Sequence, residues 1–283
     1  MNNFGVTKVE KPVVLITGAS SGIGMETAVA LAQQDYVVIA TMRNLSKKEA
    51  IMQRAKQLGI EQQIDVQLLD VTHSEEIHLF AEQVWTKYKR LDVLINNAGI
   101  AVTGSCEETQ ISEWNKQFAT NFFGIVNVTR AFLPYLREQR SGRIINISSG
   151  AAFLGSPFTA PYTASKCAVE GLSESLRLEL LPFGIKVILV EPGFYRTKIL
   201  KQMMRVPADS PYADYDQRIR AFVERFSGRA KSPQIVARKI AAIAATKHPR
   251  MRYICGMDAR LLYWLKRVFP FSWIEAVFRR LSS

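Results

Sequence analysis

The stretch TGASSGIG, residues 17–24, follows directly on VVLI, four apolar residues that are mostly β-branched. A strand that runs into a turn whose glycines open a helix aims unpaired backbone N–H groups at the carboxyl end of the strand, and such groups bind phosphate. Gly18 is expected to permit the tight turn, Gly22 to let a pyrophosphate approach the backbone, and Gly24 to let the helix pack closely. The stretch therefore predicts a phosphate-binding turn at one edge of a sheet.

Apolar runs of strand length alternate with segments of helical length along the rest of the chain. This alternation predicts right-handed βαβ units and a parallel sheet that is covered by helices on both faces. We predict an α/β fold with a doubly wound, Rossmann-type parallel sheet in one domain, residues 1–257. Six strands are expected, over residues 13–17, 36–41, 64–70, 91–97, 143–148 and 185–192.

Composition narrows the class of protein. The 37 Lys and Arg against 25 Asp and Glu give a net charge of +12, and residues 231–283 carry much of this excess. The asymmetry suggests an acidic partner such as a phospholipid surface, and a solvated basic rim is the alternative. Three widely spaced cysteines argue against disulfides and against a metal site, and no apolar run is long enough to span a bilayer. We predict a cytoplasmic location, with membrane association left open, and no nucleic-acid partner.

The spacing TGxxxGxG resembles the short-chain dehydrogenase/reductase family, and five further motifs follow in the order of that family. They are LDVT (69–72), NNAG (96–99), TNFFG (120–124), YTASK (162–166) and EPGFYRT (191–197), within a match that covers residues 12–201. PFTAPY (157–162) and ATMRN (40–44) are similar to the branch that holds hydroxysteroid and retinol dehydrogenases.

The resemblance implies four catalytic residues, Asn121, Ser149, Tyr162 and Lys166. Tyr162 would exchange a proton with the carbonyl oxygen, and Ser149, rather than its neighbour Ser148, would hydrogen-bond that oxygen. Since a phenol has a pKa of about 10, a nearby ammonium such as Lys166 is expected to lower the pKa. Lys166 would also hold the nicotinamide ribose, and the Asn121 side chain would hold a water that connects Lys166 to solvent.

Spacing places Tyr162 and Lys166 on one face of a helix, since they are four residues apart. We expect the buried face of this helix to be a different one, formed by a row of small and apolar residues at intervals of four. That row is Ala164, Ala168, Leu172, Leu176 and Leu180.

The identity of the cofactor is argued from charge. Family members that bind NAD carry an acidic residue at the end of the second strand, and here that position has no acid but is followed by Arg43. Arg43 suits a 2′-phosphate, so we predict NADP(H); that Arg43 is only an exposed loop base is the alternative. In addition to Arg43, Tyr162 and Lys166, the resemblance implies cofactor contacts from Gly18, Ser20, Ser21, Gly22, Ile23, Gly24, Asp70, Val71, Asn97, Ala98, Gly99, Pro192, Gly193 and Thr197.

The segment of about residues 194–231 interrupts the α/β alternation and is expected to cover the substrate. It is rich in Met and aromatic side chains, which adapt to irregular apolar ligands, so we predict a lipophilic substrate. That many of them only pack the segment down is the alternative. These side chains are Ile199, Leu200, Met203, Met204, Val206, Tyr212, Tyr215, Phe222 and Phe226.

Residues 258–283 are predicted to form a basic, amphipathic C-terminal extension, with one helix over 260–268 and a second after Pro270. Ile274, Val277, Phe278 and Leu281 fall on one stripe of the second helix. The extension could lie in a membrane interface, or it could pack over the substrate segment or onto a second subunit. The resemblance also implies a homodimer or homotetramer.

The leading hypothesis is an NADP(H)-dependent reductase or alcohol dehydrogenase for lipophilic carbonyl or alcohol substrates. Two alternatives stay open at this point. One is an NAD-dependent alcohol dehydrogenase working in the oxidative direction, against which Arg43 argues. The other is a non-catalytic regulator that binds the dinucleotide, against which the four catalytic residues argue.

Overall fold

A seven-stranded parallel sheet forms the centre of the molecule. The computed structural model describes residues 11–197, 199, 206–227 and 230–282, and within them the strand order is β3-β2-β1-β4-β5-β6-β7. The predicted α/β fold is confirmed, and β7 adds a strand that the sequence did not predict. The strands are β1 (Val13–Ile16), β2 (Val37–Met42), β3 (Ile64–Leu68), β4 (Val93–Asn96), β5 (Gly142–Ile147), β6 (Ile185–Pro192) and β7 (Arg252–Cys255).

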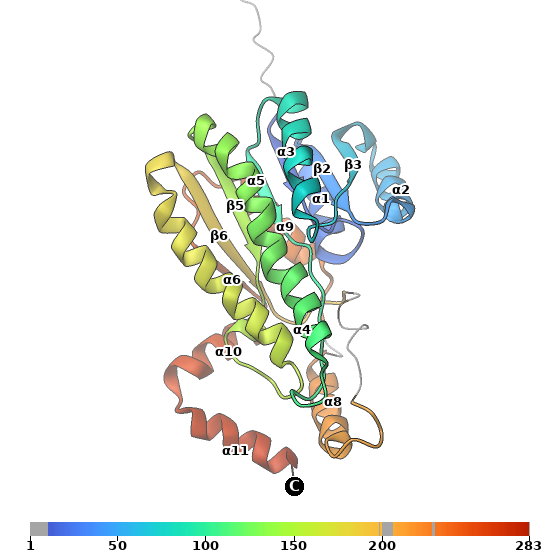
Figure 1. Ribbon diagram of the computed structural model, residues 1–283, viewed down its shortest axis with the longest axis vertical. Helices are drawn as coiled ribbons and strands as arrows, with labels where there is room; N and C mark the ends of the chain where they lie inside the picture. The colour runs from blue at the N-terminus through green and yellow to red at the C-terminus, as the bar shows by residue number, and fades with distance from the viewer. Residues whose placement is uncertain (1–10, 198, 200–205, 228–229, 283) are drawn as a thin grey trace, which may run out of the picture.

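Helices cover both faces of the sheet (Figure 1). The core on one face includes side chains from α1, α2 and α9, and the core on the other face includes side chains from α3, α5 and α6. The helices are α1 (Gly22–Ala32), α2 (Lys48–Leu58), α3 (Ser74–Tyr88), α4 (Ile111–Phe118), α5 (Gly124–Gln139), α6 (Ala160–Glu179), α8 (Ala213–Ser227), α9 (Gln234–Ala245), α10 (Met257–Val268) and α11 (Phe271–Ser282).

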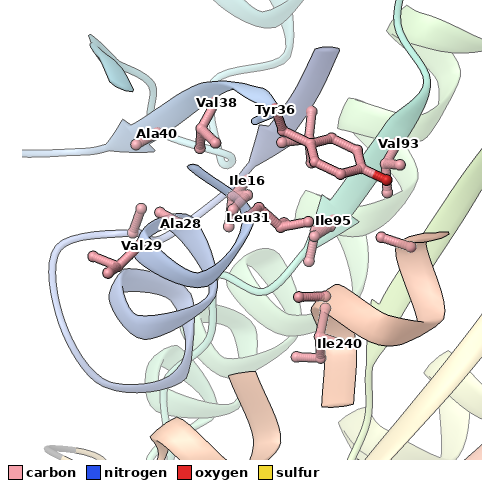
Figure 2. Packing of buried hydrophobic residues seen from close by; sticks show 14 of the residues in the cluster. Ile16, Ala28, Val29, Leu31, Tyr36, Val38, Ala40, Val93, Ile95 and Ile240 are labelled. Atoms are coloured by element: carbon pink, nitrogen blue, oxygen red, sulfur yellow. The ribbon is translucent and has the colours of Figure 1, made fainter. Parts of the chain in front are cut away.

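The strands divide their side chains between the two cores by strict alternation, as the pleat of a strand requires. On β1, Val14 and Ile16 pack toward α1 and α9, whereas Val13 and Leu15 pack toward the opposite core. Figure 2 shows Ile16 beside Leu31 of α1 in the first of these cores. Because both faces of the central strands are buried, these strands read as nearly continuous apolar runs, which is why the sequence located them. β3 instead alternates apolar and polar residues.

The strand order reverses between β1 and β4, since the chain builds outward from β1 in one direction and later from β4 in the other. In open α/β sheets, ligands bind outside the carboxyl ends of the strands at such a switch point. The segments α8, α10 and α11 lie together at one end of the molecule (Figure 1). No helix in the described part of the chain is long and apolar enough to cross a membrane.

Candidate active site

One cavity of about 380 Å³ runs along the carboxyl ends of the strands. Segments that follow β1, β2, β3, β4, β5 and β6 all contribute to its wall. The structure brings together nearly all the site residues named from the sequence, and Asn121 alone among them does not line the cavity. Those that do are Gly18, Ser20, Ser21, Gly22, Ile23, Gly24, Arg43, Asp70, Val71, Asn97, Ala98, Gly99, Ser149, Tyr162, Lys166, Pro192, Gly193 and Thr197.

The turn after β1 has no room for a side chain at two of its glycines, Gly18 and Gly24. Gly18 has a φ of +70°, and a Cβ there would lie 2.7 Å from the Cα of Ala98. A Cβ on Gly24 would lie 2.5 Å from the carbonyl oxygen of Gly18. Gly22 differs, because its φ of +60° favours glycine while a Cβ there would meet only Thr197, at an ordinary 3.5 Å. The turn therefore presents bare backbone to the cavity.

The loop after β4 is tied to this turn by hydrogen bonds. The Asn97 side-chain amide donates to the carbonyl oxygens of Thr17 (2.9 Å) and Gly18 (3.1 Å). In return, the Thr17 hydroxyl accepts from the backbone N–H groups of Asn97 and Ala98, both at 3.0 Å. Asn97 thus has a structural function that the motif NNAG did not reveal, since it fixes the two loops that flank the switch point.

The end of the cavity near β2 and β3 carries charge. Arg43 is exposed there, and Lys47 lines the same wall. The Asp70 carboxylate accepts hydrogen bonds from the Thr72 backbone N–H (3.0 Å) and hydroxyl (2.8 Å). Burial opposes ionisation of Asp70, but the bonds from Thr72, with Arg43 and His73 nearby, hold its pKa below the usual value. This end therefore offers two cations beside an ionised carboxylate.

At the opposite end, β5 and α6 bring a phenol, a hydroxyl and an ammonium together. The Tyr162 hydroxyl is hydrogen-bonded to Ser149, and the Lys166 ammonium lies 5.8 Å from the centroid of the Tyr162 ring. Lys166 also donates to the carbonyl oxygen of Ile147 at 2.9 Å. Ser149 is the serine that reaches the phenol, whereas the Ser148 hydroxyl is buried without a protein partner. The hydrogen bond from Ser149 to a carbonyl oxygen stays a prediction.

Burial dominates the protonation of this group. It raises the pKa of Tyr162, against the hydrogen bond from Ser149. It also lowers the pKa of Lys166 to about 8, against the nearby Glu170 carboxylate. The pKa of the phenol is therefore raised and not lowered as expected, because loss of hydration outweighs the hydrogen bond from Ser149. Tyr162 is held as a neutral phenol, the form that can donate a proton.

The face of α6 that carries the pair was also predicted wrongly. Its buried residues are Pro161, Ser165, Lys166, Val169 and Ser173, so the lysine lies on the buried face. The small and apolar row chosen from the sequence is largely half-buried. The physical reason is that the cavity wall and β5 cover the polar side of this helix. Polar residues therefore do not indicate which side of the helix faces solvent.

Asn121 lies behind the cavity wall in a π-helical turn, Ala119–Phe123, between α4 and α5. Its side chain is fully buried and bonds both backbone groups of Ile100, accepting from the N–H at 2.9 Å and donating to the carbonyl at 3.0 Å. Gln117, four residues earlier, also donates to the Ile100 carbonyl, at 3.1 Å. The two amides hold the cavity wall in place. The water-holding role of Asn121 stays a prediction.

Apolar side chains close the cavity beside Tyr162. Leu154, Ile199 and Val223 line this part of the wall, and Tyr212 and Tyr215 pack on Phe158 with ring centroids 6.2 and 5.5 Å apart. Some aromatic residues of the segment 194–231 therefore do pack it down, as the alternative expected. Leu200, Met203 and Met204 lie outside the described residues.

Two lining residues come from the C-terminal extension, Asp258 and Leu262, and the sequence motifs gave no signal for either. The first helix of the extension, α10, packs against the turn that follows Ser149, with Phe153 and Tyr263 in edge contact at 5.1 Å. The second helix, α11, contacts α8. Both predicted helices are present, and the extension covers the substrate segment, while much of its apolar surface stays exposed.

A buried cluster of carboxylates lies under this end of the sheet. Arg252 of β7 pairs with Glu170 of α6, with Glu191 of β6 at 2.6 Å and with Glu174 at 2.5 Å. Burial and the nearby Glu170 carboxylate together raise the pKa of Glu191 to about 7, against Arg252. One carboxyl oxygen each of Glu170 and Glu191 is buried without a donor.

Comparison with known proteins agrees with this geometry. A family model described as short chain dehydrogenase matches residues 12–206. A 3-ketodihydrosphingosine reductase of Bacteroides thetaiotaomicron is 37% identical over 260 residues, which cover 90% of this chain and 91% of the relative. Retinol dehydrogenase 8 of Bos taurus is 37% identical over 271 residues, or 91% of this chain and 85% of the relative. The resemblance to the branch with retinol dehydrogenases is thus confirmed.

Among solved structures, that of ElxO with NADP bound is similar over most of the chain. It matches with a TM-score of 0.75 and 29% sequence identity, and the match covers 90% of this chain and 99% of that one.

Proposed function

The chain belongs to the short-chain dehydrogenase/reductase family of oxidoreductases, and from that membership we propose an NADP(H)-dependent reaction on a lipophilic carbonyl or alcohol. The observation that carries the proposal is the pair Tyr162 and Ser149, hydrogen-bonded in one cavity. The bare glycine turn lies in the same cavity, so a proton donor and a phosphate-binding turn face one ligand space.

The residues present fit a dinucleotide. The glycine turn is a cradle that a Cβ on Gly18 or Gly24 would fill, and its backbone N–H groups would hold the pyrophosphate. Asp70 and Asn97 would contact the adenosine, Lys166 the nicotinamide ribose, and Thr197 the carboxamide. NADPH supplies a hydride when bound.

The chemistry of the protein side chains concerns the carbonyl oxygen. Tyr162, a neutral phenol in the ligand-free cavity, donates its proton to this oxygen as negative charge develops. Ser149 donates a hydrogen bond to the same oxygen, which stabilises that charge. The Lys166 ammonium then favours the phenolate that Tyr162 becomes. In the oxidative direction, the same groups move the proton the opposite way.

NADP(H) is favoured over NAD(H) by the charges at the far end of the cavity. Arg43 and Lys47 line it where an NAD-binding member of the family would carry an acid. A guanidinium binds a phosphate through a planar pair of N–H groups, which suits a 2′-phosphate. ElxO, which is similar over 90% of this chain, binds NADP. The alternative, an NAD-dependent alcohol dehydrogenase, would need an acidic residue in the wall beside β2, and the lining residues there include none.

The lipophilic substrate is favoured by the apolar wall beside Tyr162, formed by Leu154, Ile199, Val223 and Leu262. Relatives named for retinol and for 3-ketodihydrosphingosine act on long apolar molecules, which supports the same class. The non-catalytic alternative is disfavoured because Tyr162, Ser149 and Lys166 have the protonation and contacts that turnover needs.

We also propose that the C-terminal extension, residues 258–283, contacts a membrane surface peripherally. Its exposed side combines large apolar and basic side chains, a composition typical of helices that lie in a lipid interface. These are Leu261, Trp264, Val268, Phe271, Trp273 and Val277, with Lys266, Arg267, Arg279 and Arg280. The cytoplasmic location and the division of the chain at residue 257 stay predictions.

A homodimer or homotetramer is the assembly that we propose. Ile111 of α4, Phe123 of the π-helical turn and Leu178 of α6 are exposed, and α4 and α6 are in contact. An apolar surface on these helices favours packing against a second copy. Size-exclusion chromatography with light scattering measures the molar mass of the assembly. A monomer at all protein concentrations would contradict the proposal.

The test of the proposed function is the initial rate of NADPH and NADH consumption over apolar ketones and aldehydes, from steroid to medium-chain. We expect NADPH to be preferred, and Tyr162→Phe to lower kcat/KM by about 10²- to 10⁴-fold, the usual contribution of a general acid. Tyr135→Phe, remote from the cavity, is the matched control. Full activity of Tyr162→Phe would refute the assigned chemistry.

A further inference from the structure

Asp258 is the second residue of α10, yet its carboxylate lies in the catalytic cavity. One carboxylate oxygen accepts a hydrogen bond from the backbone N–H of Phe194, in the turn that follows β6. The same turn is bonded to the end of β7, because the Gly193 N–H donates to the carbonyl of Cys255 at 2.8 Å. The hydrogen bond of Asp258 therefore joins the start of the extension to a turn that the sheet also holds.

The space that the Asp258 carboxylate occupies accounts for the absence of a side chain at two neighbouring positions, Gly193 and Gly256. A Cβ on Gly193 would lie closer than 3.0 Å to all three carboxyl atoms of Asp258, and a Cβ on Gly256 would lie as close to its Oδ1. The two positions differ in one respect. Gly256 has a φ of +107°, which disfavours any other residue, whereas Gly193 has no positive φ and needs only the space.

The turn held by Asp258 also borders the glycine turn of the cofactor end. Thr197, three residues after Phe194, lies 3.5 Å from the position of a Cβ on Gly22. The segment from Pro192 to Thr197 is therefore fixed at its start by a side chain of the extension, and it reaches the phosphate-binding turn at its end. Any shift of the first contact changes the shape of the cavity between them.

We propose that Asp258 is a positioning residue, which seats the turn Pro192–Phe194 and so makes the C-terminal extension part of the catalytic cavity. The inference rests on the proposed function only for its effect on turnover. Its steric part, that Gly193 is required because of Asp258, concerns the protein alone. Asp258 bonds to backbone and leaves proton transfer to Tyr162.

A double-mutant cycle tests the steric part. Gly193→Ala should lower the unfolding temperature of the ligand-free protein by several degrees, since overpacking against a fixed neighbour is destabilising. In the Asp258→Ala background the same glycine change should cost little, because the colliding carboxylate is gone. Gly171→Ala, where a Cβ would meet nothing within 4 Å, is the matched control. Equal destabilisation by Gly193→Ala in both backgrounds would overturn the proposal.

Kinetics test the positioning part. Asp258→Ala should lower kcat by about tenfold or more while KM for NADPH changes less, because it loses a hydrogen bond between a carboxylate and the backbone. Asp258→Asn keeps an oxygen acceptor for Phe194 and should recover most of kcat. Glu275→Ala removes another carboxylate of the extension and is the control. If Asp258→Asn is as impaired as Asp258→Ala, or if Asp258→Ala turns over normally, Asp258 does not position the turn.

The two readouts separate this inference from the proposed function. If the protein turned over no substrate of the panel, the unfolding temperatures of the cycle would still decide whether Asp258 dictates Gly193. If turnover were normal and the cycle additive, the oxidoreductase assignment would stand while the role of Asp258 would fail.

Discussion

Two glycine turns border the same cavity, and they exclude side chains for different reasons. After β1, a Cβ on Gly24 would collide with the carbonyl oxygen of Gly18, which is backbone of the same turn. After β6, a Cβ on Gly193 would collide with the carboxylate of Asp258, a side chain 65 positions further along the chain. The first turn is closed by main chain, its own and that of the loop after β4, and the second is closed by a side chain that can be removed.

This difference determines whether the glycines of each turn can be recognised from the sequence and whether they can be replaced by other residues. A turn closed by its own backbone keeps its glycines whatever the rest of the chain does, so its spacing is readable as a motif. A turn closed by a distant side chain depends on that side chain, and its glycine can be replaced once the side chain is changed.

The largest expected effect is at the first turn. Gly24→Ala should weaken NADPH binding by about a hundredfold, because a methyl group cannot share space with a backbone carbonyl. Adding Asn97→Ala removes the side-chain amide that the methyl also meets, but it leaves the Gly18 carbonyl. Titration of NADPH by fluorescence should therefore find no rescue in the double variant. Rescue would make the two turns alike and break the comparison.

The next effect concerns the charges near the first turn. Arg43→Ala should lower the preference for NADPH over NADH by about tenfold, as expected for the loss of one charge-assisted hydrogen bond. Lys48→Ala, an exposed base that does not line the cavity, is the control. The ratio of kcat/KM for the two cofactors measures the preference. An unchanged ratio in Arg43→Ala would support the alternative of an exposed loop base.

A third prediction concerns pH and the strand that leads into the second turn. The pKa of Glu191 is raised from 4.5 to about 7, so the folded protein holds a proton that the unfolded chain releases. The stability from this group is present below about pH 4.5 and is lost as the pH rises to 7, by about 3 kcal/mol for a shift of this size.

Denaturant titrations between pH 4.5 and 8 measure this loss. Glu191→Gln should have a flatter stability profile than the wild type, because an amide cannot titrate. Glu174→Gln, an exposed partner of the same arginine, should keep the wild-type slope. Parallel profiles for the wild type and Glu191→Gln would show that Glu191 is ionised in the folded protein throughout this range.

The smallest effect is expected at the outer surface of the extension that carries Asp258. Leu261→Ala should weaken binding to anionic lipid vesicles by about fivefold, through the loss of apolar area at the interface. Leu79→Ala, an equally exposed leucine on α3, is the matched control. Co-sedimentation measures binding. No binding of the wild type, or equal loss in both variants, would contradict the membrane proposal.

Much of the fold could be predicted because its signals are local. Each of β1, β2, β4, β5 and β6 is a nearly continuous apolar run, since both faces of the sheet are covered there. β3 alternates apolar and polar residues, which is also a strand pattern. The strand β7 was missed because RYIC is four residues long and half-buried for most of its length, so it has neither the length nor the apolar run of the others. The two helices of the extension were found because Pro270 separates two amphipathic segments.

The site was predictable where residues are close in sequence or are held by backbone. The glycine turn and the pair Tyr162 and Lys166 belong to this class. Asp258 was missed because no pattern links it to Gly193, and only tertiary packing brings them together. The predicted direction of the shift in the Tyr162 pKa is wrong for a related reason. Burial raises this pKa, and burial depends on the folded surroundings and not on the spacing of two residues.

Transfer of the hydride itself can be followed with a labelled cofactor. With NADPH deuterated at the reactive nicotinamide carbon and an apolar ketone, the wild type should place deuterium on the carbinol carbon of the product. Tyr162→Phe should do so at least about a hundredfold more slowly although NADPH still binds. Product without deuterium, or transfer at the wild-type rate in Tyr162→Phe, would contradict the account.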